Sequence, residues 1–231
     1  MRPRLLALAL AAVLIAPLAS APAQERTAPR QRDWTQVVSA TAEGGFRMGN
    51  PRASVKVVEY LSLTCPHCAS FAEEGAPGLM TYVRSGRVSL EYRNFVLNGL
   101  DLAAALLSRC AAPQNYFALN HAILASQAQW MGRVEAMSAA QRQEMQGLGD
   151  LQRLRRVAAI AGLDAIAARH GVTPAQADAC MADQARLDRI IQMREAADRY
   201  GVTGTPTFAI NGRIAGSAGT WATLEPLLRG R

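Results

Sequence analysis

Two cysteines three positions apart constrain the fold of this chain more than any other feature. Cys65 and Cys68 enclose a Pro-His dipeptide and come just after an apolar, β-branched run at 55–61. Such a run predicts a buried central strand, and helical sequence follows from Cys65 to about residue 85. The pair is therefore expected at a strand-to-helix turn, where two thiols can close into a small disulfide ring and pass that disulfide on.

The other strand signals lie on both sides of a long helical block. Residues 34–41 predict a first strand, and 43–51 predict a hairpin or wide turn. A strand at 87–92 should run parallel to 55–61, because the helix between them makes a crossover connection. Glycines 75 and 78 and proline 77 are expected to kink that helix.

No strand is expected from about 98 to 183. Five helices are expected there, at 101–111, 113–129, 137–147, 151–161 and 174–182. A sixth follows at 184–200. Strand character then returns at 206–210 and 213–215 around the turn signal Asn211-Gly212, and a last helix is expected at 221–228.

The first residues have the pattern of a secretory signal peptide. Two arginines precede an apolar run at 5–18, and small residues at 19–23 give an A-x-A cleavage site after Ala23. The run is about 14 residues, shorter than the roughly 20 that a membrane-spanning helix needs. We expect a cleaved signal peptide at 1–23, a flexible tail at 24–33 and an exported protein.

Charge and cysteine content narrow the class of protein. The formal charge of +7 is spread along the chain without a dense Lys/Arg block, so nucleic acid is not an expected partner. All four cysteines lie after the signal peptide. An even number of cysteines in an oxidising compartment suggests two pairs.

A Cys-x-x-Cys motif alone is compatible with several kinds of site. Haem attachment needs His directly after the second Cys, and Ala69 stands there. Zinc needs further ligands, but His121 and His170 are isolated, so no metal is expected. A purely structural disulfide in so small a ring would be strained, which leaves thiol–disulfide exchange.

The surroundings of Cys65 favour a reactive thiolate. A thiol at a helix N-terminus faces unpaired backbone N–H groups and the positive end of the helix dipole. Pro66 suits a first helical turn, and His67 can add a donor or a positive charge. A low pKa of Cys65 would stabilise the reduced pair and make the disulfide a strong oxidant.

Three segments of the chain resemble one family. Residues 58–68 closely resemble the active-site segment of DsbA-type periplasmic thiol oxidases, residues 201–208 resemble the cis-proline loop of that family, and 44–51 resemble its lead-in. The resemblance implies an α/β, thioredoxin-like fold with an inserted all-helical domain. The thioredoxin-like domain would comprise 34–97 and 184–231, and the helical insertion 98–183.

The resemblance also implies roles at the redox pair. Cys65 would be the exposed nucleophile that forms a mixed disulfide with the client, and Cys68 the buried resolving thiol. Pro66 and His67 would tune the redox potential. Glu59 would be a buried proton relay for Cys68, with an outward surface position as the alternative.

The same resemblance implies a client-binding loop. Pro206 would be cis and face the redox pair, so that Thr205 offers its backbone to a client peptide. An ordinary trans turn is the alternative at this position.

The second pair of cysteines lies in the helical block. We expect Cys110 and Cys180 to form a structural disulfide, and similar extra pairs in DsbA-like proteins agree with this expectation. Two buried free thiols are the alternative.

The sequence as a whole predicts a monomeric periplasmic oxidase. It would donate the Cys65–Cys68 disulfide to exported proteins with free thiols, and a DsbB-type membrane oxidase would reoxidise it. Apart from the redox-active disulfide, no cofactor is expected. The alternatives are a disulfide isomerase or reductase, and a peptide-binding chaperone with a secondary redox pair; replacing Cys65 with Ser would inactivate an oxidase and spare a chaperone.

Overall fold

The computed structural model describes residues 32–229. The expected signal peptide and nearly all of the expected tail lie outside the described residues. Among the residues that are described, no helix is both long enough and apolar enough to cross a membrane.

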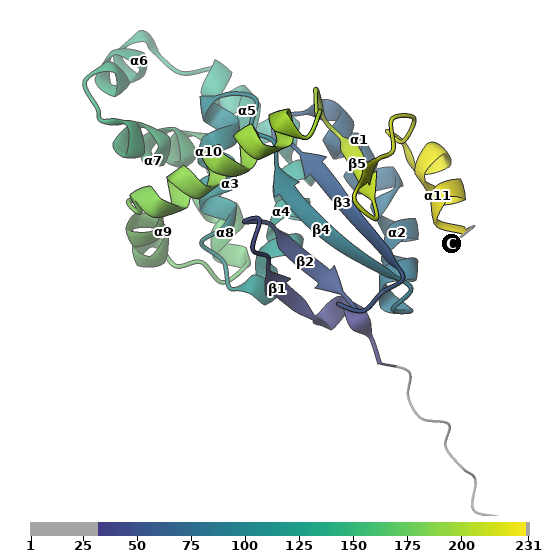
Figure 1. Ribbon diagram of the computed structural model, residues 1–231. Helices are drawn as coiled ribbons and strands as arrows, with labels where there is room; N and C mark the ends of the chain where they lie inside the picture. The colour runs from purple at the N-terminus through teal and green to yellow at the C-terminus, as the bar shows by residue number, and fades with distance from the viewer. Residues whose placement is uncertain (1–31, 230–231) are drawn as a thin grey trace, which may run out of the picture. The chain divides into compact units, whose positions relative to one another are not determined.

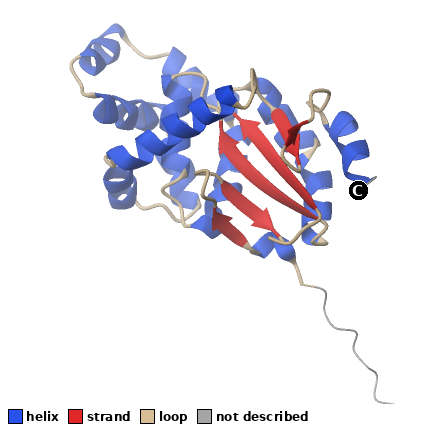
Figure 2. Cartoon of the chain, viewed as in Figure 1, coloured by secondary structure: helices blue, strands red, loops and turns tan. Residues whose placement is uncertain are grey.

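A single mixed sheet organises the described part of the chain (Figure 2). Its six strands follow the order β1-β2-β4-β3-β5-β6. The central neighbours β3 and β4 are parallel, and the other neighbouring pairs are antiparallel. The strands are β1 (Val38–Ala40), β2 (Phe46–Gly49), β3 (Val55–Leu61), β4 (Val88–Asn94), β5 (Thr207–Ile210) and β6 (Arg213–Ile214).

Helices surround this sheet (Figure 1). Two lie between β3 and β4, eight lie between β4 and β5, and one follows β6. They are α1 (Pro66–Glu74), α2 (Ala76–Arg84), α3 (Gly99–Ser108), α4 (Pro113–Ala125), α5 (Gln127–Glu135), α6 (Ala139–Gln146), α7 (Asp150–Ala161), α8 (Leu163–Arg169), α9 (Pro174–Met181), α10 (Gln184–Arg199) and α11 (Trp221–Arg229), with a short 3₁₀ turn η1 (Trp34–Gln36) before β1.

This is the thioredoxin-like α/β fold that the sequence predicts. The parallel pairing of β3 with β4 and the absence of strands between β4 and β5 both agree with the prediction. The long α10 contacts β4 of the sheet as well as α3 and α9 of the helical block. The domain boundaries at 97/98 and 183/184 stay a prediction.

Several predicted elements differ in detail. Residues 46–49 form strand β2 rather than part of a turn, with Phe46 and Met48 buried, because β2 pairs with β1 on one side and β4 on the other. The predicted helix 113–129 is two helices, α4 and α5, that meet at Ser126. Helix α8 was not predicted.

The expected kink after the redox pair is a full break between α1 and α2. Gly75 joins the two helices, and a Cβ atom there would lie 2.6 Å from Cε2 of Phe71. Only a residue without a side chain therefore lets the end of α1 lie this close to the Phe71 ring.

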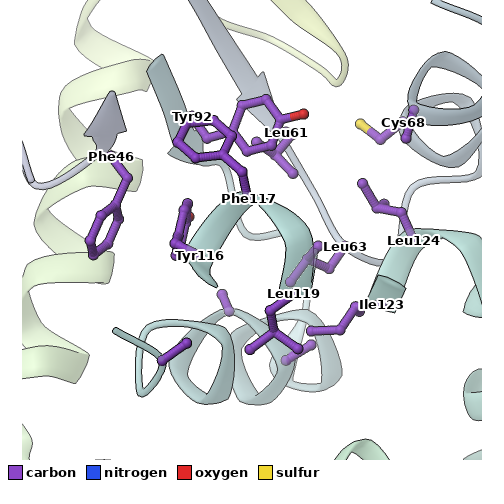
Figure 3. Packing of buried hydrophobic residues seen from close by; sticks show 14 of the residues in the cluster. Phe46, Leu61, Leu63, Cys68, Tyr92, Tyr116, Phe117, Leu119, Ile123 and Leu124 are labelled. Carbon is purple, nitrogen blue, oxygen red and sulfur yellow. The ribbon is translucent and has the colours of Figure 1, made fainter. Parts of the chain in front are cut away.

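The alternation of β3 decides what lies beneath the redox pair. Because successive side chains point to opposite faces of a strand, Val57, Glu59 and Leu61 share one face. Val57 and Leu61 belong to the main apolar cluster, which also contains Cys68 and parts of α3 and α4 (Figure 3). Tyr60 faces a smaller cluster with Ala197 of α10 on the other side. The strand thus carries a carboxyl group into the main core.

Cys110 and Cys180 are joined by a disulfide. The two sulfur atoms are 2.14 Å apart, and the Cα atoms are 5.7 Å apart. The bond links the turn after α3 to α9, across 70 positions of the chain.

Candidate active site

The redox pair lies where β3 ends and α1 begins. Residues 62–65, which we call the approach loop, connect the strand to the helix, and Cys65 is the N-cap residue of α1. Pro66 occupies the first turn, where its missing N–H costs nothing. The Cys65 carbonyl accepts from the N–H groups of Cys68 at 3.1 Å and Ala69 at 3.2 Å.

Both cysteines of the pair are free thiols, and both are buried. Cys68 is 0% exposed and Cys65 is 6% exposed, whereas Pro66 and His67 are exposed. The expectation of an exposed Cys65 is therefore wrong for this state of the chain. The loop at Thr205 covers the sulfur, and the Cys65 thiol donates a hydrogen bond to the Thr205 carbonyl at 3.2 Å.

The structure brings the Thr205–Pro206 segment directly against the redox pair. The peptide bond between these two residues is cis. The Thr205 hydroxyl is buried and has no hydrogen-bond partner among the described residues. It is thus available to donate to the Cys65 sulfur once that sulfur loses its proton.

The two thiols differ strongly in acidity. A hydrogen bond from the Cys68 thiol, with smaller help from the Thr205 side chain and the N–H groups of Cys68 and His67, lowers the pKa of Cys65 to about 5. The same interaction seen from Cys68, together with burial and the nearby Glu59 carboxyl, raises the pKa of Cys68 far above its ordinary range. At neutral pH the reduced pair is therefore one thiolate beside one thiol.

Glu59 lies beneath this pair in the core. It is 2% exposed, its Oε2 atom has no hydrogen-bond partner among the described residues, and it stands between Tyr92 of β4 and Phe208 of β5. Burial raises the pKa of Glu59 to about 8. The outward position considered as an alternative is excluded, and the carboxyl group is protonated at neutral pH.

Two hollows flank the first turns of α1. One, of about 470 Å³, lies between α1 and the α4–α5 junction and is lined by Pro66, Glu73, His121 and Leu124, among others. The other, of about 360 Å³, lies between α1, the Thr205–Pro206 segment and the start of α11, and is lined by His67, Phe71 and Trp221, among others. A third hollow, of about 490 Å³ and lined by residues of α6, α7 and α9, contains none of the predicted site residues.

Among residues 32–229, no group of three His, Cys, Asp or Glu side chains is placed to hold a metal ion. His121 lines the first hollow, and His170 ends α8.

Sequence reasoning missed two residues at the site. Asp101 of α3 and Gln127 of α5 are buried and hydrogen-bond the backbone of the approach loop. Asp101 is a charged residue in an otherwise apolar helical stretch, whereas Gln127 stands among other polar residues of α5, and neither pattern says where the side chain points.

Comparison with known proteins gives a consistent family. The family model described as thioredoxin matches residues 41–229. A provisionally named protein-disulfide oxidoreductase of Rickettsia felis is 29% identical over 199 residues, which cover 85% of this chain and 63% of that protein. A similarly named protein of Rickettsia conorii is 30% identical over 74% of this chain and 54% of its own length. The chain thus spans less than two thirds of these relatives.

Solved structures cover the chain more evenly. A protein-disulfide isomerase from Novosphingobium aromaticivorans is 34% identical with a TM-score of 0.72, over 80% of this chain and 95% of that one. The alpha-DsbA1 protein of Wolbachia pipientis is 25% identical with a TM-score of 0.60, over 83% and 92% of the two chains. Both similarities extend across the sheet and the helical block.

Proposed function

The chain is a DsbA-like member of the thioredoxin family, and on that basis we propose that it is a thiol:disulfide oxidase acting on exported proteins. The observation that carries this proposal is the difference in acidity within the redox pair. A pKa of about 5 at Cys65 makes its thiolate the stable form at neutral pH. Stabilising the reduced pair makes the Cys65–Cys68 disulfide a strong oxidant.

The exchange proceeds in two steps. A client thiolate attacks the Cys65 sulfur of the Cys65–Cys68 disulfide; the bond between the two cysteines breaks, and Cys68 leaves with the electron pair and takes up a proton. A second client thiolate then attacks the client sulfur of the mixed disulfide and releases Cys65 as a thiolate. The client gains one disulfide and loses two electrons, which the redox pair retains. The low pKa of Cys65 speeds its departure in the second step, because more acidic thiols are better leaving groups.

Glu59 is proposed to supply the proton that Cys68 needs. Its carboxyl is protonated at neutral pH, and it lies close enough to Cys68 to raise the pKa of that thiol. Returning the proton when Cys68 is reoxidised would complete the relay.

The Thr205–Pro206 segment is proposed to bind the client backbone. Thr205 lies against the Cys65 sulfur, so a client strand paired there would bring its cysteine within reach of Cys65. Pro66 and His67 are exposed beside the sulfur and would tune its potential.

Export and reoxidation belong to the same proposal. The signal-like segment 1–23 supports delivery to the periplasm, where a DsbB-type membrane oxidase would restore the disulfide. The protein would act as a monomer and use no cofactor other than its own disulfide.

A redox titration against glutathione tests the oxidase assignment. We expect a potential of the Cys65–Cys68 pair that is more oxidising than about −180 mV, the value typical of protein disulfide isomerase. A potential near that of thioredoxin, about −270 mV, would contradict the oxidase assignment. Cys65→Ser and Cys68→Ser should both abolish oxidation of a reduced client, because neither variant can form the 65–68 disulfide. With a disulfide-bonded client, the Cys65 thiolate of Cys68→Ser should attack the client disulfide and remain trapped as a mixed disulfide.

Isomerase activity is the second candidate, because one similar solved structure is described as a protein-disulfide isomerase. Refolding of a scrambled client by the reduced protein measures it. An isomerase would restore native pairing faster than it oxidises a reduced client, and an oxidase would do the reverse. A chaperone would keep Cys65→Ser fully active in suppressing aggregation.

A further inference from the structure

The approach loop is buried, so its backbone groups cannot form hydrogen bonds with water. Ser62 and Leu63 are 0% exposed, Thr64 is 7% exposed and Cys65 is 6% exposed. Buried backbone N–H and C=O groups need partners, since leaving one unpaired costs about as much as a lost hydrogen bond. The partners of this loop therefore decide where the Cys65 sulfur lies.

Side chains from the helical block form hydrogen bonds with both backbone polar groups of Leu63. Its N–H donates to Oδ1 of Asp101 at 2.8 Å, and its carbonyl accepts from Nε2 of Gln127 at 2.8 Å. Asp101 belongs to α3 and Gln127 to α5, so two separate helices hold the two peptide units that flank the Cα atom of Leu63.

Each of these side chains also holds a second backbone group. Nε2 of Gln127 donates to the carbonyl of Cys65 at 3.0 Å, and Oδ2 of Asp101 accepts from the N–H of Leu97 at 2.9 Å. Leu97 follows β4, so Asp101 ties together the loops that leave the two central parallel strands. The neighbouring Asn98 adds one further bond to the Thr64 hydroxyl at 3.1 Å.

Given the redox function proposed above, we infer that Asp101 and Gln127 are positioning residues of the exchange reaction. They fix the backbone of Cys65 so that its sulfur stays beside Cys68 and over the N–H groups that open α1. The helical block thereby controls the acidity of a thiol that belongs to the sheet and its crossover helix.

The chemistry of each residue type fits this role. A carboxylate offers two acceptor oxygens, and Asp101 uses one for each N–H; an asparagine would turn an NH₂ group toward one of them. An amide NH₂ offers two donors, and Gln127 uses them on two carbonyls; a side chain without a donor would leave the Leu63 carbonyl unpaired. Neither position tolerates an isosteric exchange without loss of a bond.

Loosening the loop acts on the redox pair in a defined direction. The Cys65 thiolate depends on donors held at fixed positions around the sulfur, including the N–H groups of His67 and Cys68. If the loop relaxes, the thiolate loses part of this stabilisation. The reduced pair then becomes less favoured, and its disulfide becomes a weaker oxidant.

Gln127→Met tests this inference with little change of side-chain length or charge. Thiolate absorbance at 240 nm gives the pKa of Cys65, and equilibration with glutathione gives the exchange equilibrium constant. We expect the pKa of Cys65 to rise by about one unit and the equilibrium to shift about tenfold toward the disulfide, which corresponds to roughly 30 mV. Asp101→Asn should change both quantities in the same direction.

Gln129→Met is the matched control, because Gln129 lies on the same helix but is exposed. It should change neither the pKa nor the equilibrium. A purely structural role of Gln127 would lower the unfolding midpoint of Gln127→Met while both redox readouts stay at the wild-type values, and that result would overturn the inference. If Gln127→Met does not fold, Gln127→Asn, which keeps the amide but shortens its reach, provides the same comparison.

The outcome stays separable from the oxidase assignment. A wild-type potential near that of thioredoxin would refute the oxidase function, but the pKa of Cys65 in the variants could still be compared with wild type. Unchanged pKa values in both variants would refute the positioning role alone.

Discussion

At the scale of single residues, the proposed chemistry depends on the difference in pKa between the two thiols of one short motif. A hydrogen bond from Cys68 and the N–H groups that open α1 lower the pKa of Cys65, whereas Cys68 lies in the apolar core near the Glu59 carboxyl. The motif predicts a lowered pKa at Cys65. It does not predict that Cys65 is covered by Thr205, because that contact comes from a segment 140 positions away.

The pH dependence of alkylation checks the acidity of Cys65. In the reduced protein, reaction with iodoacetamide should rise with a midpoint near the pKa of about 5 and level off above pH 7. An ordinary thiol, with a pKa of about 8.5, would still gain reactivity between pH 7 and 9. Cys65→Ser serves as the control and should remove this phase of the reaction; a midpoint above pH 8 would contradict the assignment.

Replacing Glu59 with Gln should change both stability and reaction rate. Burial raises the folded pKa of Glu59 to about 8, above its unfolded value, so its contribution to stability is complete at low pH and is lost as pH rises to about 8. The free energy of unfolding of Glu59→Gln should therefore rise relative to that of wild type by up to about 1.4 kcal/mol per pH unit between roughly pH 4.5 and 8.

Urea unfolding of the oxidised proteins at pH 5 and pH 8 measures that gain. Glu74→Gln, at an exposed position on α1, is the control and should show no such trend. In Glu59→Gln, the rate of client oxidation should also fall, because Cys68 loses its proposed proton donor. An unchanged rate would remove Glu59 from the proposed relay.

At the scale of elements, the most informative feature is the junction of α1 and α2. Gly75 lets the chain pass close to Phe71, whose ring packs on Phe208 of β5 with centroids 4.7 Å apart. Phe208 is only two residues beyond the cis Pro206. The Phe71–Phe208 contact therefore connects the helix that carries the redox pair to the strand that follows the Thr205–Pro206 segment.

Gly75→Val should disturb that alignment. The new side chain would displace Phe71, and overpacking of this kind costs about 1–3 kcal/mol. We expect chemical denaturation to show that loss, together with slower client oxidation. Gly132→Ala is the matched control, because Gly132 lies inside α5 with open space around it, and it should stabilise the protein by about 0.5–1 kcal/mol. Wild-type stability of Gly75→Val would contradict this reading of the junction.

Element order could be predicted much better than element contacts. Apolar periodicity located both central strands and most helices, and the Asn211-Gly212 signal located the last hairpin, where both residues have positive φ. Strand β2 was not predicted, because it has only four residues and is flanked by glycines, an asparagine and a proline, so its alternation of apolar and polar residues is weak. The hydrogen bonds of Asp101 and Gln127 to the approach loop could not be predicted, because local sequence does not specify which distant backbone a polar side chain reaches.

At the scale of the whole molecule, the disulfide between Cys110 and Cys180 joins the helical block to itself. It closes a loop of 70 positions that runs from the end of α3 to α9 and so includes α4, α5 and the wall of one hollow. Because α3 and α5 also carry Asp101 and Gln127, the block that the disulfide stabilises is the one that holds the approach loop.

Removing this disulfide should lower stability and spare the chemistry. The chain-entropy model gives a loss of about 4 kcal/mol for a loop of this length. We expect the double variant Cys110→Ser, Cys180→Ser to unfold at lower temperature and still oxidise a client. Non-reducing peptide mapping should find the 110–180 bridge in wild type. Full loss of oxidase activity in the folded double variant would show that this bond takes part in exchange.

The pairing of β3 with β5 also has a consequence for how the protein is made. The backbone N–H of Lys56, within β3, donates to the side chain of Asn211, which follows β5 and lies 155 positions later in the chain. Because synthesis starts at the N-terminus, Cys65 and Cys68 are made long before Thr205, which contacts the Cys65 sulfur. Closing so long a loop costs entropy and is expected late in folding. In that interval the nascent polypeptide exposes its thiols to the cysteines that follow and to any oxidant nearby. Until its last strands dock, the protein that we propose to form disulfides in other chains is itself open to the same reaction.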